Sequence, residues 1–258
     1  MKETYNAYQD FQKQFKRIET KYILEKTVLK QVLQDLEAYM EADAYANSTI
    51  TNIYFDTEQF DLIQDSIAKK HAREKVRMRL YDPQPQASSK AFLEIKKKID
   101  GIGYKNRLTS TANAITSYVT TGLSIIDGLD QSLIDDQIQK DLTQLRQRHQ
   151  QLQPKMYIYY DRLSFRGKQD ADIRITIDQN LLYRDWDICL SAGKSGNDLL
   201  DPSKVIMEVK VPGQCPSWLL QVFNKYGISQ TSFSKYGTAY RLASQENRKE
   251  LSLARNTL

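Results

Sequence analysis

The residues that could do chemistry in this chain are cations that alternate with apolar side chains over short segments. Alternation with a period of two places the cations on one face of a β-strand and the apolar side chains on the other. Each such segment alone is typical of an amphipathic strand with its charges in water. The cations that recur in this pattern are Lys21, Arg77, Arg79, Lys96, Lys105, Arg107, Arg162, Arg174 and Lys210.

The full set of segments favours a bound polyanion. Lysine is a poor strand former compared with threonine or tyrosine, and like charges on neighbouring strands repel each other. A phosphate-rich ligand lying between the strands would offset that repulsion. Arginine offers forked donors to phosphate oxygens, and lysine adds point charges.

Three glutamates each precede a lysine by two residues, on three separate predicted strands. They are Glu19, Glu94 and Glu208. On a solvated surface, such ion pairs contribute under about 1 kcal/mol each. Alternatively, the carboxylates coordinate Mg²⁺ or Mn²⁺, and the cation shares the phosphate charge with the lysines. The residues themselves leave both interpretations open.

The composition limits the classes of function. The 258 residues include 37 Lys and Arg and 32 Asp and Glu, which gives a modest net charge of +5. Two histidines and two cysteines argue against zinc chemistry, a Ser-His-Asp triad and a disulfide framework. The sequence contains no Gly-x-x-x-x-Gly-Lys-Ser/Thr loop of the P-loop nucleotide binders.

Location and partners follow from what the sequence does not contain. Neither a membrane-spanning apolar stretch nor a signal peptide occurs, so we expect a cytoplasmic protein. We expect no nucleic-acid partner, because aromatic residues are not interleaved with the basic strand positions as stacking platforms. A membrane-protein partner and the oligomeric state are left open.

The elements that must position these residues follow from hydrophobic periodicity. Alternation predicts eight strands, with a further short one at 185–190, and spacing at three and four residues predicts helices. The predicted strands cover residues 15–24, 49–55, 74–81, 91–98, 102–108, 155–166, 171–181 and 205–211. The predicted helices cover 1–15, 25–39, 57–70, 110–151 with breaks at Gly122 and Gly128, 217–225 and a stretch from 234 to 243.

The order of these elements predicts one α+β domain over residues 1–258, with a core at about 15–243 and a helical insertion at about 110–151. The amphipathic helices need an apolar surface, which the apolar faces of the strands provide. If the helices pack outside a curled sheet, the charged faces turn inward. A barrel lined by arginine and lysine cannot be filled like an apolar one and would be a wet tunnel that holds an anion.

Eight short motifs run in order from about Phe15 to Arg241, and each is weak alone. They are Arg17-x-Glu19-x-Lys21-Tyr22, Ile53-Tyr54-Phe55-Asp56, Val76-Arg77-Met78-Arg79-x-Tyr81, Glu94-x-Lys96, Tyr160-x-Arg162, Arg174-x-Thr176-x-Asp178, Glu208-x-Lys210 and Ser234-Lys235. As a series they resemble the VTC domain, the catalytic module of the vacuolar transporter chaperone complex. That domain belongs to the triphosphate tunnel metalloenzyme (CYTH-like) superfamily.

The resemblance implies a fold and an activity. The fold would be an eight-stranded antiparallel β-barrel tunnel with helices packed outside. The activity would be synthesis of inorganic polyphosphate from ATP with Mn²⁺ or Mg²⁺. The sequence shows no SPX domain, so control by inositol phosphates is not carried over from the family. It shows no membrane spans either, so coupled translocation is not carried over.

The resemblance also implies a role for each matched residue. Those implied to bind the triphosphate and the growing chain are Arg77, Arg79, Lys96, Arg162, Arg174, Lys210 and Lys235, with Lys21 near the transferred phosphoryl group. Further substrate-binding positions are Arg17, Lys105, Arg107 and Ser234, together with Tyr160 stacked on the nucleotide base. Glu208 would be the main metal ligand, with Glu94 and Glu19 beside it.

Three functions fit these residues. The first is a polyphosphate polymerase that transfers the γ-phosphate of ATP to a growing chain, and it needs no histidine base because a terminal phosphate is already an anionic nucleophile. It is favoured by Arg17, which stands where the superfamily usually has a glutamate. The second is a tripolyphosphatase or nucleoside triphosphatase that uses water. The third is a non-catalytic polyphosphate-binding module.

Overall fold

The computed structural model describes residues 17–122, 136–149 and 151–256. The helix expected over 1–15 and the middle of the expected helical insertion, 123–135, lie outside the described residues. No helix of the described part is both long and apolar enough to cross a membrane.

In the part of the chain that the structure describes, the strands form one ten-stranded antiparallel sheet. They are β1 (Arg17–Glu25), β2 (Met40–Asp56), β3 (Ala72–Leu80), β4 (Lys90–Ile99), β5 (Ile102–Thr111), β6 (Gln153–Gly167), β7 (Arg174–Arg184), β8 (Asn197–Asp198), β9 (Lys204–Pro212) and β10 (Gln230–Thr231). Their order is β10-β1-β9-β7-β6-β2-β3-β4-β5, and β8 pairs with β7. The eight long strands correspond to the eight main predicted strands, whereas the short strand expected at 185–190 is absent.

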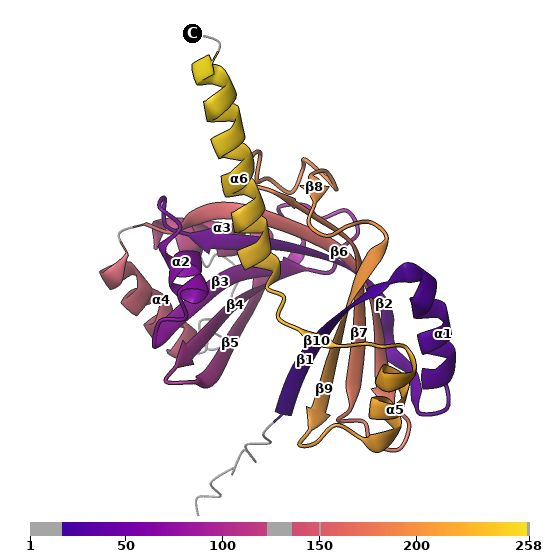
Figure 1. Cartoon of the computed structure of the whole chain (residues 1–258). Coiled ribbons are helices and arrows are strands. Elements are labelled where there is room, and N and C mark those ends of the chain that lie inside the picture. Colours follow the sequence, from indigo (N-terminus) through magenta and orange to yellow (C-terminus); the bar gives the residue numbers. More distant parts are fainter. Residues whose placement is uncertain (1–16, 123–135, 150, 257–258) are drawn as a thin grey trace, which may run out of the picture.

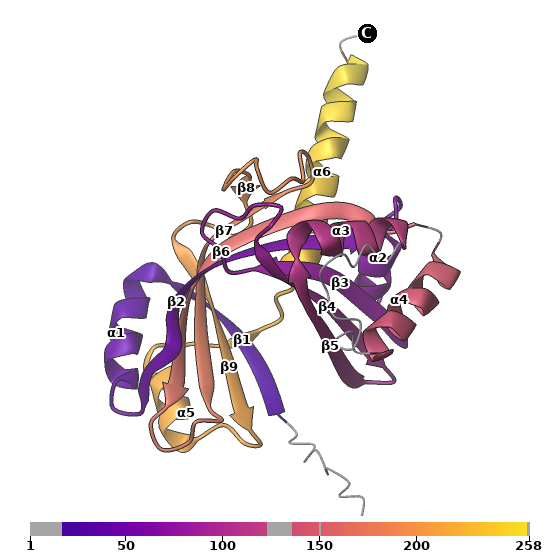
Figure 2. The ribbon, with the colours of Figure 1, turned by 180° about the vertical axis from the view of Figure 1, so that it is seen from behind.

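The sheet is curled but not closed, so the prediction of a closed barrel is wrong. In the described part of the chain, β5 and β10 end the hydrogen-bonded order without pairing to each other. Figures 1 and 2 show the two halves of the sheet turned toward each other across this opening. One edge of β1 is covered by β10, and β5 carries the charges of Lys105 and Arg107, which are typical of an unpaired edge strand.

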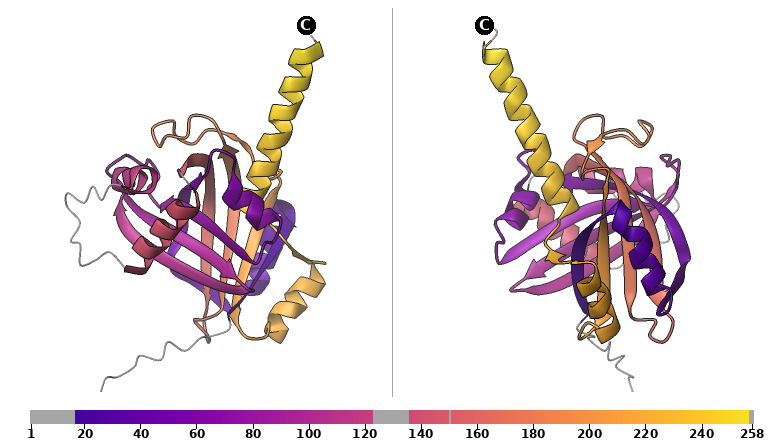
Figure 3. Two further views of the ribbon diagram at one scale, coloured as in Figure 1. Left: turned by 90° about the vertical axis from the view of Figure 1, so that its left-hand side faces the viewer. Right: turned by 45° about the vertical axis from the view of Figure 1, so that its right-hand side comes forward.

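Two helical layers cover the outer face of the sheet, as the sequence predicted. On one half, α1 (Lys26–Leu36) and α5 (Ser217–Lys225) bury Val32 and Leu219 against β1, β7 and β9. On the other half, α2 (Asp61–Ile67), α3 (Ala112–Thr121) and α4 (Asp136–Arg148) pack on β2 to β5. Figure 3 shows these helices on the outside of the curl.

The last helix, α6 (Lys235–Asn256), departs from the expectation that all helices pack outside. Its first turns place Tyr236, Ala239 and Ala243 against apolar residues such as Ile158 and Ile206. These residues share the strand face that carries Arg162 and Glu208, which is the inner face. The helix then extends away from the body (Figure 1). One end of the inner face is therefore apolar and covered.

Strand β2 begins nine residues before the strand predicted at 49–55. Its first part, Met40 to Ser48, shows no clear alternation, and its register against β6 shifts between Ala42 and Asn47. Pairing with the long β6 makes this segment a strand, and that pairing leaves no local signal in the sequence.

Candidate functional site

The charged faces of the strands converge on the inner face of the curled sheet. On β3, Lys75, Arg77 and Arg79 point inward while Val76 and Met78 are buried under the helices. The two halves influence each other across the opening: Glu19 on β1 acts electrostatically on Lys96 of β4, and Lys21 acts on Lys75. Lys75 also donates a hydrogen bond to Ser234 Oγ, at 3.3 Å.

Two cavities lie between these elements. The large cavity has a volume of about 1120 Å³, and its charged lining includes Arg107, Arg162, Arg174, Lys210 and Glu208. The small cavity, of about 440 Å³, is lined by Lys21, Glu19, Lys75 and Ser234, among others. The first volume is sufficient for a nucleotide-sized ligand.

A row of three lysines crosses β3, β4 and β5. Lys75 pairs in register with Lys96, and Lys96 pairs with Lys105. Of the three, only Lys105 forms an ion pair within the described residues. Lys96 stays accessible to water, but the surrounding protein and the charge of Arg77 lower its pKa to about 8. This lysine row (Lys75, Lys96 and Lys105) has an excess of positive charge that a polyanion would neutralise.

Glu94 precedes Lys96 by two residues on the same face of β4 and lies between two arginines. Both Arg77 and Arg107 pair with Glu94 across the strands. Glu94 is fully buried and accepts from Arg77 Nε at 2.7 Å and from Arg107 Nε at 3.0 Å, with Lys105 Nζ at 2.7 Å. Burial would raise the pKa of Glu94, but these cations hold it far below its usual range. We name these four residues the Glu94 cluster.

Arg79 is the buried cation of the inner face that lacks a carboxylate partner among the described residues. Its Nε donates to Asn52 Oδ1 at 3.0 Å, and its Nη2 donates to Tyr160 Oη at 3.1 Å. Neutral partners orient the guanidinium without cancelling its charge. Tyr54 does the same for Arg77, whose Nη1 donates to Tyr54 Oη at 3.3 Å.

Arg162 and Lys235 share the buried carboxylate of Asp178. Arg162 binds Asp178 in a bidentate way, at 2.6 and 2.8 Å, and Lys235 Nζ lies 2.5 Å from Asp178 Oδ2. Burial opposes the charge, but Lys235 and Arg162 lower the pKa of Asp178 to about 2. This pairing fixes the first residue of α6 to β7 and leaves two positive groups for one negative group.

On the other half of the sheet, β1 and β9 bring two carboxylates and two lysines together. The ladder pairs Lys21 with Glu208 and Glu19 with Lys210. Lys210 Nζ lies 2.8 Å from Glu208 and 3.8 Å from Glu19, and Lys21 Nζ lies 3.9 Å from Glu208. Burial would raise the pKa of Glu208, but Lys210 and then Lys21 lower it.

The three predicted metal ligands do not form one cluster. In the described part of the chain, no three His, Cys, Asp or Glu side chains gather to hold a metal ion. Glu94 lies on β4, where cations of β3 and β5 hold it, whereas Glu19 on β1 and Glu208 on β9 share Lys210. Two carboxylates still suit Mg²⁺ or Mn²⁺, because these ions commonly take one or two carboxylates together with substrate phosphates.

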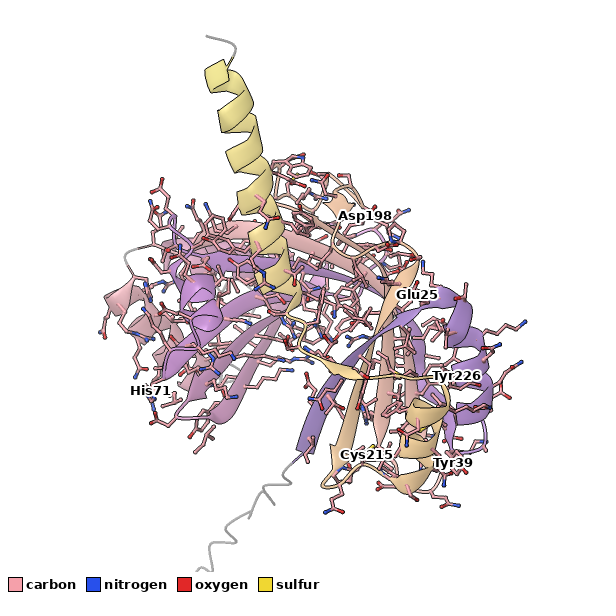
Figure 4. All side chains as sticks on the ribbon, in the orientation of Figure 1. Glu25, Tyr39, His71, Asp198, Cys215 and Tyr226 are labelled. Atoms are coloured by element: carbon pink, nitrogen blue, oxygen red, sulfur yellow. The ribbon has the colours of Figure 1, made fainter. Side chains whose placement is uncertain are left out.

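Two predicted residues remain, Arg174 and Arg17. Arg174 is half exposed in the large cavity, with Nη1 at 3.6 Å from Asp43. The side chain of Arg17 lies outside the described residues. Both cysteines are free thiols, and Figure 4 places Cys215 and His71 on opposite halves of the molecule.

Sequence reasoning assigned no role to three residues that orient the cations: Asn52, Tyr54 and Asp178. Two of them stood in the quoted motifs, and Asp178 shares its strand face with Arg174. The position of Asp178 on the same strand face as Arg174 was the signal in the sequence that could have identified its role. A buried acid in a basic row is expected to hold cations in place.

Comparison with known protein families tests the resemblance to the VTC domain. The model of the family described as VTC domain matches residues 16–244. The chain belongs to the VTC domain family. No curated protein matches this member of the family. The resemblance inferred from the eight motifs is therefore confirmed over nearly the whole chain.

A solved structure shares the fold of this VTC domain. A "putative adenylate cyclase" from Bacillus halodurans superposes with a TM-score of 0.51 at 13% identity, covering 84% of this chain and 93% of the other. A second one, from Vibrio parahaemolyticus, has a TM-score of 0.43 at 12% identity, covering 86% and 96%. At such identity the first likeness concerns the fold alone, and the second carries no argument. Family and fold together support a tunnel-fold enzyme that acts on phosphate compounds.

Proposed function

We propose that this protein is a polyphosphate polymerase that transfers the γ-phosphate of ATP to a growing inorganic polyphosphate chain. The observation that carries the proposal is the lysine row beside Arg79. Lys75, Lys96 and Arg79 lie on the inner face without carboxylate partners among the described residues. A linear polyanion is the ligand that neutralises several such charges at once.

Phosphoryl transfer needs positioning and charge neutralisation more than covalent chemistry from the protein. Arg162 and Lys210 in the large cavity would bind the triphosphate, and Arg77 and Arg79 would hold the phosphates that lie along β3. Lys21 lies between Glu19 and Glu208, where it would contact the transferred group. These side chains are oriented before substrate arrives, because Glu94, Asp178 and Asn52 fix the arginines.

A divalent metal, Mn²⁺ or Mg²⁺, would be held by Glu208 and Glu19 together with phosphate oxygens. It would supply further neutralisation of the phosphate charge. That Glu94 is a metal ligand stays a prediction. Its ion pairs with Arg77 and Arg107 do not favour this role.

Hydrolysis of tripolyphosphate or of nucleoside triphosphates is the second candidate. The observation that favours it is that β5 and β10 do not pair in the described part of the chain, which leaves the inner face open along one side. Water could then replace the polyphosphate terminus as nucleophile. A binding module without turnover is the third reading of the same charges. Single-domain organisation and a cytoplasmic location stay predictions, and a membrane-protein partner stays open.

The test is product analysis with purified protein, ATP and Mn²⁺. We expect a polymer that a polyphosphatase degrades, at least tenfold less of it with Lys96→Ala or Glu208→Ala, and an unchanged yield with the exposed control Lys30→Ala. Free phosphate without polymer would establish hydrolysis instead. Polyphosphate binding without any ATP turnover would support the binding module and overturn both enzymatic functions.

A further inference from the structure

Tyr160, implied by the family resemblance to stack on the base, is poorly placed for this in the structure. It is 1% exposed and lines neither cavity. Lys235 Nζ lies 4.5 Å from its ring centroid and Arg162 Cζ lies 5.3 Å from it. Two cations would have to leave the ring before a base could reach it. Its hydroxyl serves instead as the acceptor for Arg79.

Another aromatic pair does line the large cavity. We name Tyr81 and Phe92 the aromatic shelf. Their rings meet edge to face, with centroids 5.7 Å apart at 77°. Arg107 covers Phe92, with Cζ 4.7 Å from its centroid, while Tyr81 remains 40% exposed. Tyr81 therefore presents accessible ring surface to the cavity. Its ring packs on Phe92, which Arg107 in turn covers.

The hydroxyl end of Tyr81 is anchored toward the phosphate-binding residues. Burial would raise its pKa, but Arg79 and then Arg107 lower it, so both guanidinium groups lie near the phenol oxygen. An anchored ring loses little conformational freedom when a ligand stacks on it. Preorganised aromatic surface of this kind is what base-binding sites use.

The distance from the shelf to the phosphate-binding arginines suits a nucleotide. Tyr81 directly follows β3, and Arg162 lies on β6, with only β2 between these two strands. Two strand spacings, with an offset of two residues along the strands, correspond to roughly 12 Å. That separation leaves room for a ribose between a base on Tyr81 and phosphates at Arg162. Both residues line the same cavity of about 1120 Å³.

We propose that the aromatic shelf binds the base of the nucleoside triphosphate substrate, with the ring of Tyr81 as the stacking surface. This rests on the proposed function in one respect, namely that the donor is a nucleotide. The triphosphate then extends from the shelf past Arg107 toward Arg162 and Lys210. Tyr160 becomes a positioning residue for Arg79 in place of a base platform.

The experiment compares a ligand that has a base with one that lacks it. Binding of ATP and of tripolyphosphate is measured by calorimetry in EDTA, so that metal-dependent turnover is absent. We expect Tyr81→Leu to weaken ATP about tenfold, as expected for loss of a stacked base, and to leave tripolyphosphate unchanged. Tyr81→Phe loses only the anchored hydroxyl, which Tyr81→Leu loses as well, and keeps the ring, so it should bind ATP more tightly than Tyr81→Leu.

The matched control is Tyr104→Leu, since Tyr104 is a half-exposed tyrosine on β5 that lines neither the large nor the small cavity. It should leave both affinities unchanged. The shelf is overturned if Tyr81→Leu leaves ATP unaffected, or if it weakens both ligands equally, because the loss would then concern the phosphate site.

The two proposals fail in different ways. Base-dependent binding through Tyr81 without any polymer would preserve the shelf and overturn the polymerase. Polymer synthesis with no difference between ATP and tripolyphosphate in Tyr81→Leu would preserve the polymerase and overturn the shelf. Wild-type protein that binds neither ligand would overturn both.

Discussion

At the scale of single residues, Glu94 shows how a buried acid can serve a basic site. It is fully buried, and its carboxylate contacts Arg77, Lys105 and Arg107. Removing one charge from such a cluster leaves several cations uncompensated. We predict that Glu94→Gln destabilises the protein by about 3 kcal/mol, at the low end for a broken buried pair because Lys105 and Arg107 are partly in water. Urea denaturation measures this.

Two further readouts separate this positioning role from metal binding. Tripolyphosphate should raise the melting temperature of Glu94→Gln more than that of the wild type, because the anion replaces the lost negative charge. Mn²⁺ affinity should fall in Glu208→Gln and stay unchanged in Glu94→Gln. Weaker Mn²⁺ binding in Glu94→Gln would restore the metal-ligand role that the sequence predicted.

Lys96 should make ligand binding depend on pH. Its pKa in the free protein is lowered to about 8 by its protein surroundings and by Arg77. Phosphate binds the protonated amine, so above pH 8 the amine is mostly neutral and binding must take up a proton. We predict that affinity for tripolyphosphate decreases from pH 7 to pH 9, with proton uptake near pH 8 measured by calorimetry in buffers of different ionisation enthalpy.

The control for this pH dependence is Lys96→Arg, whose guanidinium stays charged throughout the range. It should bind with less proton uptake and with a flatter pH profile. Equal proton uptake in the variant would assign the titration to another group, for example Lys75, whose pKa is also lowered by burial and by Lys21.

At the scale of elements, Arg184 organises the loop that follows β7. The side chain is fully buried and donates to the carbonyl oxygens of Asp187, Cys189, Gly193 and Ser195, at 2.6 to 3.1 Å. We predict that Arg184→Met destabilises the protein by about 3 kcal/mol, because four carbonyl oxygens lose their charged donor at once. Urea denaturation gives the loss, and limited proteolysis should cut the 185–196 loop faster.

A matched variant on the same loop is Lys194→Met. Lys194 lies 5.1 Å from the ring centroid of Tyr159 and is not buried. Lys194→Met should change the free energy of unfolding by at most about 0.5 kcal/mol, as surface substitutions usually do. An equally small change in Arg184→Met would show that the loop holds its conformation without the guanidinium.

The elements also show what the sequence could and could not predict. Alternation identified the eight long strands and the inward cations, because a strand face is a local property. The residue that lies opposite each cation depends on register between strands distant in the chain. Arg162 meets Asp178, and Arg77 meets Glu94, through such pairings. The metal assignment of Glu94 and the outer placement of α6 therefore could not be checked from the sequence.

At the scale of the whole molecule, the curled sheet carries like charges on two halves whose outer strands, β5 and β10, do not pair with each other in the described part of the chain. Across the inner face, burial and the charge of Lys21 on β1 lower the pKa of Lys75 on β3. Closure of the barrel would bring such charges closer in the absence of an anion. A bound polyanion should therefore draw the halves together, because it attracts both.

We predict that tripolyphosphate protects β5 and β1 from amide hydrogen exchange more than it protects the outer helices α1 and α5. At 100 times its dissociation constant, a ligand stabilises the native state by about 2.7 kcal/mol, which for a chain of this size corresponds to roughly 5 to 10 °C in melting temperature. Lys96→Ala should reduce the protection of β5, and Lys30→Ala on α1 should not. Uniform protection over all elements would mean that the anion stabilises the fold without moving its two halves.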